Sequence, residues 1–138
     1  MEIAKIGVVG AGQMGNGIAH VCALAGYDVV MTDISEDALK ASVDLIEKNL
    51  ARQAGRGKIS DEDMASTLSR IHTTGTLSDL GPTDLIIEAA TERETVKQAI
   101  FEDLLPHLKP HTILTSNTSS ISITRLASRT DRPEKFMG

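Results

Sequence analysis

The chain has 138 residues, enough for one domain of ordinary size, and its formal net charge is −5 at pH 7. This acidic balance argues against a nucleic-acid partner, which normally needs a basic face. The single cysteine, Cys22, excludes a disulfide framework within the chain. The chain starts without a charged leader, and no apolar run is long enough to cross a bilayer. We therefore expect a cytoplasmic protein with no membrane partner and no metal site.

Apolar runs alternate with helical patterns, which is typical of βαβ units around a parallel sheet. Aromatic residues make up only 2% of the chain, so the core must be aliphatic. The first strand is predicted at residues 6–9, followed by a glycine-rich turn at 10–15. A helix follows, with apolar residues at helical spacing at Met14, Ile18, Val21 and Ala25. The second strand covers residues 27–32 and ends at Asp33.

Two further helices are predicted before the next strand. Ser35 is an N-cap candidate for the first, whose apolar stripe is Leu39, Val43, Ile46 and Leu50. Gly55 and Gly57 end that helix. Ser60 begins the second, with Asp63 three residues on as a weaker form of the capping box.

The second half of the chain repeats the alternation. Strands are predicted at residues 71–74, 85–87 and 112–115, with a helix at 95–105 between the last two. A short helix at about 122–127 follows, and one more strand begins at Phe136.

The turn after the first strand fits the pattern G-x-G-x-x-G. In a strand–turn–helix context, Gly10 allows the tight turn, Gly12 lets the backbone approach a pyrophosphate, and Gly15 lets the helix pack on the strand. The amides that open the helix, including those of Gln13 and Met14, would then face the phosphates. The alternative is an ordinary glycine-rich turn, but the flanking elements favour a dinucleotide site. The sequence therefore predicts an α/β fold of the Rossmann type, a doubly wound, mainly parallel sheet with helices on both faces.

Asp33 ends the second strand at about the spacing expected for the acid that binds the adenosine ribose. Its carboxylate would accept hydrogen bonds from the ribose hydroxyls and repel a 2′-phosphate. The next residue, Ile34, offers no cation for that phosphate, so the expected cofactor is NAD rather than NADP. The alternative is that Asp33 only initiates the turn into the following helix.

Polar residues directly follow two later strands, at residues 88–92 (Glu-Ala-Ala-Thr-Glu) and 116–120 (Ser-Asn-Thr-Ser-Ser). The carboxyl ends of parallel strands meet at one crevice, where a nicotinamide and a substrate would bind. Helix capping is the alternative explanation for part of the serine cluster.

These two segments, together with residues 10–19, closely resemble the L-3-hydroxyacyl-CoA dehydrogenases, and the bacterial 3-hydroxybutyryl-CoA dehydrogenases are the nearest members. The resemblance covers the whole chain in order and spacing. It implies an enzyme that oxidises the 3-hydroxyl of a 3-hydroxyacyl-CoA to the 3-ketoacyl-CoA with hydride transfer to NAD. In that family the first domain binds NAD, and a helical second domain closes over the acyl-CoA and forms a homodimer.

The resemblance also implies roles for particular residues. Asp33 would bind the adenosine ribose, and Glu92 and Lys97 would line the cleft near the nicotinamide. Asn117 would contact the nicotinamide ribose, and Ser119 would act in catalysis by donating a hydrogen bond to the substrate's 3-oxygen.

One departure from the family concerns its general base, a histidine in a His-Phe-Phe-Asn-Pro type of strand motif. Alignment of residues 132–138 places that histidine two residues beyond Gly138, and the helical domain later still. The histidines present, His20, His72, His107 and His111, do not match the position. We expect residues 1–138 to be an NAD-binding domain that stops short of its end and is inactive alone. The alternatives are a stand-alone NAD-binding module and a 3-hydroxyisobutyrate or 6-phosphogluconate type of dehydrogenase, which Asp33 and the serine cluster disfavour.

A basic cluster stands out in this acidic chain, since no Asp or Glu lies between Glu47 and Asp61. Its members are Lys48, Arg52, Arg56 and Lys58. The plain interpretation is that these cations lie on a solvated face near a helix C-terminus, where the helix dipole favours positive charge. The sharper hypothesis, supported by the resemblance, is that Arg52, Arg56 and Lys58 bind the phosphates of coenzyme A and that Asn49 adds a neutral hydrogen bond.

Overall fold

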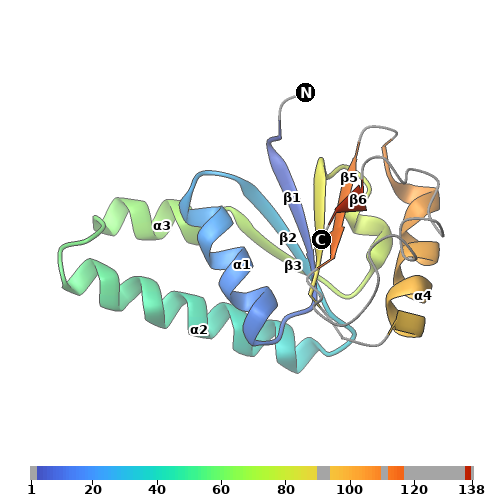
Figure 1. Ribbon diagram of the computed structural model, residues 1–138. Helices are drawn as coiled ribbons and strands as arrows, with labels where there is room; N and C mark the ends of the chain where they lie inside the picture. Colours follow the sequence, from blue (N-terminus) through green and yellow to red (C-terminus); the bar gives the residue numbers. More distant parts are fainter. Residues whose placement is uncertain (1–2, 90–93, 110–111, 117–135, 138) are drawn as a thin grey trace.

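The computed structural model describes residues 3–89, 94–109, 112–116 and 136–137 (Figure 1). The strands are β1 (Lys5–Val9), β2 (Asp28–Thr32), β3 (Ile71–Thr74), β4 (Leu85–Glu88), β5 (Ile113–Ser116) and β6 (Phe136–Met137). Within the described residues they form one six-stranded sheet in the order β3-β2-β1-β4-β5-β6, and every neighbouring pair is parallel. The winding direction reverses at β1, which is the doubly wound topology of the Rossmann fold. The predicted fold class is confirmed.

Helices cover both faces of this sheet. They are α1 (Gln13–Leu24), α2 (Glu36–Gly55), α3 (Asp61–Ser69) and α4 (Glu94–Leu104), with the short 3-10 helices η1 (Leu77–Leu80) and η2 (Leu105–His107). Figure 1 shows α1, α2 and α3 on one side of the sheet and α4 on the other. The hairpin of α2 and α3 extends away from the sheet, past its β3 edge.

The core is divided between the two faces. Ile6 and Val8 of β1 pack with α1 and α2 in one cluster, whereas Val9 packs with Phe101 and Leu104 of α4 in the other. Successive side chains of a strand point to opposite faces, so strands buried on both sides read as continuous apolar runs. The predicted strands agree with the observed ones to within one residue at each end, and this rule explains the agreement for β1, β2 and β4. It does not apply to β3, an edge strand with exposed His72 and Thr73.

Both predicted N-caps are confirmed. The Ser35 hydroxyl accepts a hydrogen bond from the amide of Ala38 at 3.1 Å. Ser60 and Asp63 form a reciprocal capping box at the start of α3. The stripe of α2 is also confirmed, with Leu39, Ile46 and Leu50 buried and Val43 partly buried. The predicted helix at 122–127 lies outside the described residues.

The apolar spacing that predicts α1 does not mark its buried face, and this is a correction. Met14 is 57% exposed and Val21 is 67% exposed. The buried residues of α1 are instead Gly15, Asn16, Ala19 and Ala23. The start of the helix lies so close to the end of the first strand that a Cβ at Gly15 would not fit. Met14 and Val21 point outward, whereas Ile18 of the predicted stripe is partly buried against the core.

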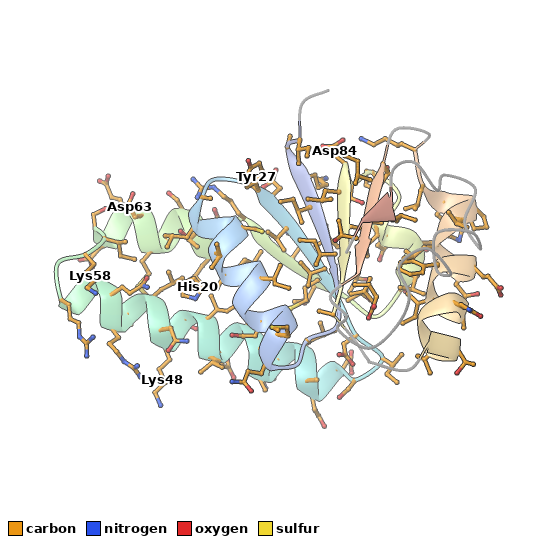
Figure 2. All side chains as sticks on the ribbon, in the orientation of Figure 1. His20, Tyr27, Lys48, Lys58, Asp63 and Asp84 are labelled. Atoms are coloured by element: carbon orange, nitrogen blue, oxygen red, sulfur yellow. The ribbon has the colours of Figure 1, made fainter. Side chains whose placement is uncertain are left out.

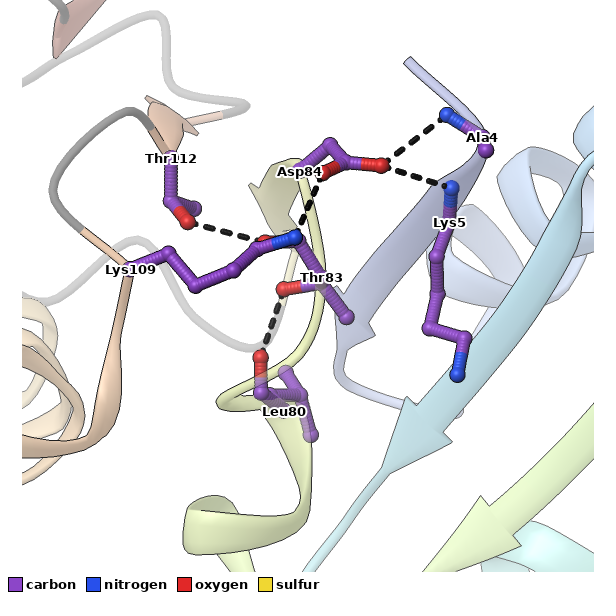
Figure 3. A network of polar contacts seen from close by, with 7 residues as sticks. All are labelled: Ala4, Lys5, Leu80, Thr83, Asp84, Lys109 and Thr112. Carbon is purple, nitrogen blue, oxygen red and sulfur yellow. Dashed lines mark hydrogen bonds and ion pairs between the residues drawn. The ribbon is translucent and has the colours of Figure 1, made fainter. Parts of the chain in front are cut away.

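A carboxylate clamps the amino ends of β1 and β4 together (Figure 3). Asp84 is 7% exposed, and its Oδ2 accepts hydrogen bonds from the amides of Ala4 at 3.0 Å and Lys5 at 3.1 Å. Its Oδ1 pairs with Lys109 Nζ at 2.7 Å. This clamp lies at the edge of the sheet opposite to the glycine turn, which follows the carboxyl end of β1.

The Asp84→Asn variant is expected to lose about 1–3 kcal/mol of unfolding free energy, because hydrogen bonds to a charged acceptor are lost. One amide oxygen can still accept from the two backbone donors, but the amide nitrogen would face the Lys109 ammonium. Urea unfolding measures the change. An unchanged denaturation midpoint would show that the clamp contributes nothing to stability.

Candidate functional site

The turn between β1 and α1 brings backbone donors to the carboxyl edge of the sheet. Gly10 has φ of 111°, a left-handed conformation that glycine adopts without strain, and its amide donates to Thr32 O at 2.8 Å. Helix α1 begins at Gln13 with Gly12 as N-cap, and no side chain caps this end. The first amides of α1 are therefore available to an anion, at the positive end of the helix dipole.

The glycines of this turn have different surroundings. A Cβ on Gly15 would lie 1.8 Å from the carbonyl oxygen of Gly10, so Gly15 is required by the fold. A Cβ on Gly12 would meet nothing within 4 Å. Gly12 also has an ordinary extended conformation, with φ of −75° and ψ of −167°. Neither the space around Gly12 nor its backbone conformation requires glycine. Close approach of a ligand to the backbone would explain why glycine is present at this position.

Asp33 joins the glycine turn to the start of α2. Its Oδ2 accepts from the amide of Ala11 at 2.8 Å, and its Oδ1 accepts from the amide of Ser35 at 2.9 Å. These two bonds show that Asp33 does help to form the turn into α2. A carboxylate offers about four lone-pair positions, however, so the partly exposed Asp33 can still accept from hydroxyl donors.

A mostly apolar cavity of 290 Å³ opens beside Asp33. Its lining comes from the ends of β1 and β2 with the residues that follow them, the start of η1 and the loop before it, and α4: Val9, Gly10, Thr32, Asp33, Ile34, Gly75, Leu77, Val96 and Ile100. No Lys or Arg is among these residues. A larger groove of 550 Å³ runs along α2 and β3, but its lining carries three carboxylates, Glu36, Asp37 and Asp44, against one cation, Lys40, and suits an anionic nucleotide poorly.

The structure brings one set of predicted residues together. Gly10, Gly12, Gln13, Met14, Gly15 and Asp33 all lie at the corner formed by β1, α1 and β2. Gln13 and Met14 are exposed, and both residues also line a shallow groove along α1 with Gly17, Ile18, Val21 and Cys22. The spacing of Val96 and Ile100 predicts an inward stripe of the helix but not a site, and Val96 is in fact 39% exposed in the cavity wall.

The other predicted site residues stand apart or are not described. Arg52, Arg56 and Lys58 are exposed at the far end of α2 and in the turn after it, and Asn49 is partly buried. Figure 2 shows Lys48 and Lys58 on the protruding hairpin, away from the sheet. Lys97 belongs to α4, but its side chain is not described. Glu92, Asn117 and Ser119 lie outside the described residues.

Other chemistry receives no support from the described residues. Burial raises the pKa of the Cys22 thiol, which disfavours the reactive thiolate. The described part of the chain holds no group of three or more residues suited to a metal ion. None of its helices combines the length and apolar character of a membrane span. His20, His72 and His107 do not line the cavity beside Asp33.

The family described as 3-hydroxyacyl-CoA dehydrogenase, NAD binding domain, matches residues 5–138. The chain belongs to this family. The 3-hydroxybutyryl-CoA dehydrogenase of Bradyrhizobium diazoefficiens is 56% identical over 136 residues, which are 99% of this chain and 46% of that protein. The crystal structure of (S)-3-hydroxybutyryl-CoA dehydrogenase from Ralstonia eutropha is 44% identical, with a TM-score of 0.93 over 98% of this chain and 48% of that one. The structure of 3-hydroxybutyryl-CoA dehydrogenase from Escherichia coli is 41% identical, with a TM-score of 0.95 over 99% of this chain and 29% of that one.

These matches confirm the resemblance drawn from the glycine turn and the two polar segments. This 3-hydroxyacyl-CoA dehydrogenase NAD-binding domain spans about half the length of the Bradyrhizobium and Ralstonia relatives. Its glycine turn and Asp33 therefore belong to a domain whose family is described by NAD binding.

Proposed function

We propose that the chain binds NAD at the corner of β1, α1 and β2 and is the cofactor domain of an L-3-hydroxyacyl-CoA dehydrogenase. The observation that supports this proposal is the space at Gly12, where an added Cβ would have no atom within 4 Å. This space adjoins the uncapped start of α1 and the Asp33 carboxylate. In the complete enzyme, bound NAD would accept the hydride from C3 of the substrate. The residues of this domain hold and orient that cofactor.

Each part of the corner suits one part of the dinucleotide. The amides that open α1 would bind the pyrophosphate. Asp33 would accept hydrogen bonds from the adenosine ribose hydroxyls. The apolar cavity lined by Val9, Leu77 and Ile100 would receive the flat face of the adenine.

We propose NAD rather than NADP as the cofactor. A 2′-phosphate would replace a hydroxyl next to Asp33, and two negative charges would face each other in a partly buried place. The cavity lining offers no Lys or Arg to compensate, and Ile34, next to Asp33, is fully exposed and apolar. The repulsion therefore favours the dinucleotide that lacks the phosphate.

The nicotinamide and substrate side of the site rests on family resemblance. Strands β4 and β5 end side by side, with Glu88 opposite Ser116, at the same edge of the sheet as the glycine turn. We propose that Glu92 and Lys97 line the nicotinamide side of the cleft. Asn117 would contact the nicotinamide ribose, and Ser119 would donate a hydrogen bond to the 3-oxygen of the substrate.

The protruding hairpin suits the nucleotide end of an acyl-CoA. A helix of the 20 residues of α2 is about 30 Å long, so Arg52 and Arg56 lie far from the cofactor corner. Exposed, flexible cations suit the phosphates of coenzyme A, and Asn49 on the same helix would add a hydrogen bond. We also propose a cytoplasmic location and a homodimer for the full-length form.

An oxidation assay tests the function in the longer protein that carries this domain. With NAD present, the enzyme should reduce the cofactor when given L-3-hydroxybutyryl-CoA but not the D enantiomer.

The basic cluster is tested by substitution. Changing Arg52, Arg56 and Lys58 together to Gln should raise the KM for the acyl-CoA by about tenfold. The KM for a pantetheine thioester, which lacks the nucleotide, should stay unchanged.

Lys40→Gln is the control, because Lys40 is also exposed on α2 but lies near its other end. Failure to oxidise either enantiomer would contradict the proposed activity. Equal changes in KM for the two thioesters would show that the basic cluster does not bind the nucleotide of coenzyme A and is only a solvated surface.

A further inference from the structure

A buried polar pair joins α1 to α2 in a layer that is mostly apolar. Asn16 is 6% exposed and Ser42 is 3% exposed. The Asn16 side-chain amide, Nδ2, donates to the backbone carbonyl of Ser42 at 2.7 Å and lies 2.7 Å from its hydroxyl. The carbonyl is an acceptor only, so it fixes the orientation of the Asn16 amide.

The pair extends to the sheet through a third residue. The Ser42 hydroxyl donates to the sulfur of Met31 in β2 at 3.6 Å. Ala19 on α1, and Leu39 and Ile46 on α2, lie one turn from the pair on the same helix faces and are buried in the apolar cluster. Apolar contacts tolerate sliding of one helix along another, whereas a buried hydrogen-bonded pair selects one register. The pair therefore sets where α1 stands along α2.

These two helices carry the two halves of the proposed cofactor corner. Asn16 follows Gly15 directly, and its own amide donates to Gly12 O at 2.8 Å. It thus lies in the first turn of α1, where the amides face the pyrophosphate. Ser42 lies about two turns into α2, which starts next to Asp33 through the Asp33–Ser35 hydrogen bond.

The bond from Asp33 to the amide of Ala11 already holds the turn. It does not fix the direction of α1 beyond Gly15, because that direction depends on what the helix packs against. The contact of Asn16 with Ser42 supplies a second point of attachment, one residue beyond Gly15. At the other end of α1, Arg70 Nη1 donates to the carbonyl oxygen of Ala23 at 2.9 Å, so the Asn16 contact is the attachment nearest to the cofactor corner.

We infer that Asn16 and Ser42 are positioning residues that set the first turn of α1 relative to Asp33, so that one ligand can engage the pyrophosphate amides and the ribose acid together. This inference rests on the proposed NAD site. It separates two classes of ligand: ADP-ribose spans both subsites, whereas adenosine engages only the Asp33 side.

The test compares these two ligands by titration on the purified chain. Asn16→Leu keeps the approximate size of the side chain but removes the donor. It should raise the Kd for ADP-ribose by about tenfold, while the Kd for adenosine stays within about twofold of wild type. Ser42→Ala retains the backbone carbonyl as acceptor, so it should shift the Kd for ADP-ribose in the same direction by about threefold.

Asp84→Asn provides the matched control, because it weakens the fold at the opposite edge of the sheet. It should leave both dissociation constants unchanged. If Asn16→Leu lowers the melting temperature but binds both ligands as the wild type does, the pair is structural only and the inference is wrong. If Asn16→Leu does not fold, Ser42→Ala decides in the same way. A wild-type chain that binds neither ligand would instead overturn the proposed function.

Discussion

Replacing Gly15 with alanine is expected to destabilise the domain by at least about 3 kcal/mol and to abolish NADH binding. The added Cβ would lie 1.8 Å from the oxygen and 2.7 Å from the carbon of the Gly10 carbonyl, and both are backbone atoms. Helix α1 must then move off the turn, which displaces the amides that bind the pyrophosphate. Urea unfolding and NADH titration measure the two effects.

Two other glycines of the same segment separate folding from binding. Gly17 is exposed and a Cβ there would meet nothing, so Gly17→Ala should stabilise α1 by up to about 1 kcal/mol and leave NADH affinity unchanged. Gly12→Ala should fold with near wild-type stability but bind NADH weakly, because the new methyl group would occupy the space proposed for the pyrophosphate. Wild-type affinity in Gly12→Ala would place the cofactor elsewhere.

The second large effect is expected at Asp33. Asp33→Ser should weaken NADH binding by about tenfold to a hundredfold, since hydrogen bonds to a charged acceptor contribute about 1.5–3 kcal/mol. It should weaken NADPH binding much less, because the repulsion of the 2′-phosphate disappears with the charge. The ratio of the two dissociation constants is the measurement that matters.

Asp33→Asn controls for the structural role of this side chain. Its amide oxygen can replace one of the two bonds that the carboxylate accepts from Ala11 and Ser35. It should therefore be the more stable variant and still lose discrimination between the cofactors. A variant of either kind that keeps the wild-type preference would show that Asp33 does not select NAD.

The strands and caps were predictable because their signals are local. The central strands β1, β2 and β4 are buried on both faces and read as apolar runs, and Ser35 and Ser60 predict the helices that follow them. The buried face of α1 was not predictable from apolar spacing. Its contact with the sheet is made by Gly15, Ala19 and Ala23, whose small side chains contribute little to an apolar pattern. Met14 and Val21, which do contribute to that pattern, point outward.

The cofactor corner was predictable only in part, for a similar reason. The glycine turn and Asp33 follow from spacing along the chain. The cavity lined by Leu77, Val96 and Ile100 depends on how η1 and α4 pack around the end of β1, which no local pattern encodes. The hydrogen bonds from Asn16 to Ser42 join residues 26 positions apart, so they too required the tertiary structure.

Calorimetric titration of the 138-residue chain with NADH and with NADPH tests the central claim most directly. The site described here is expected to bind NADH at least about tenfold more tightly than NADPH, which corresponds to a difference of about 1.4 kcal/mol. Equal affinities, or no binding of NADH at all, would contradict the assignment of the β1–α1–β2 corner as an NAD site.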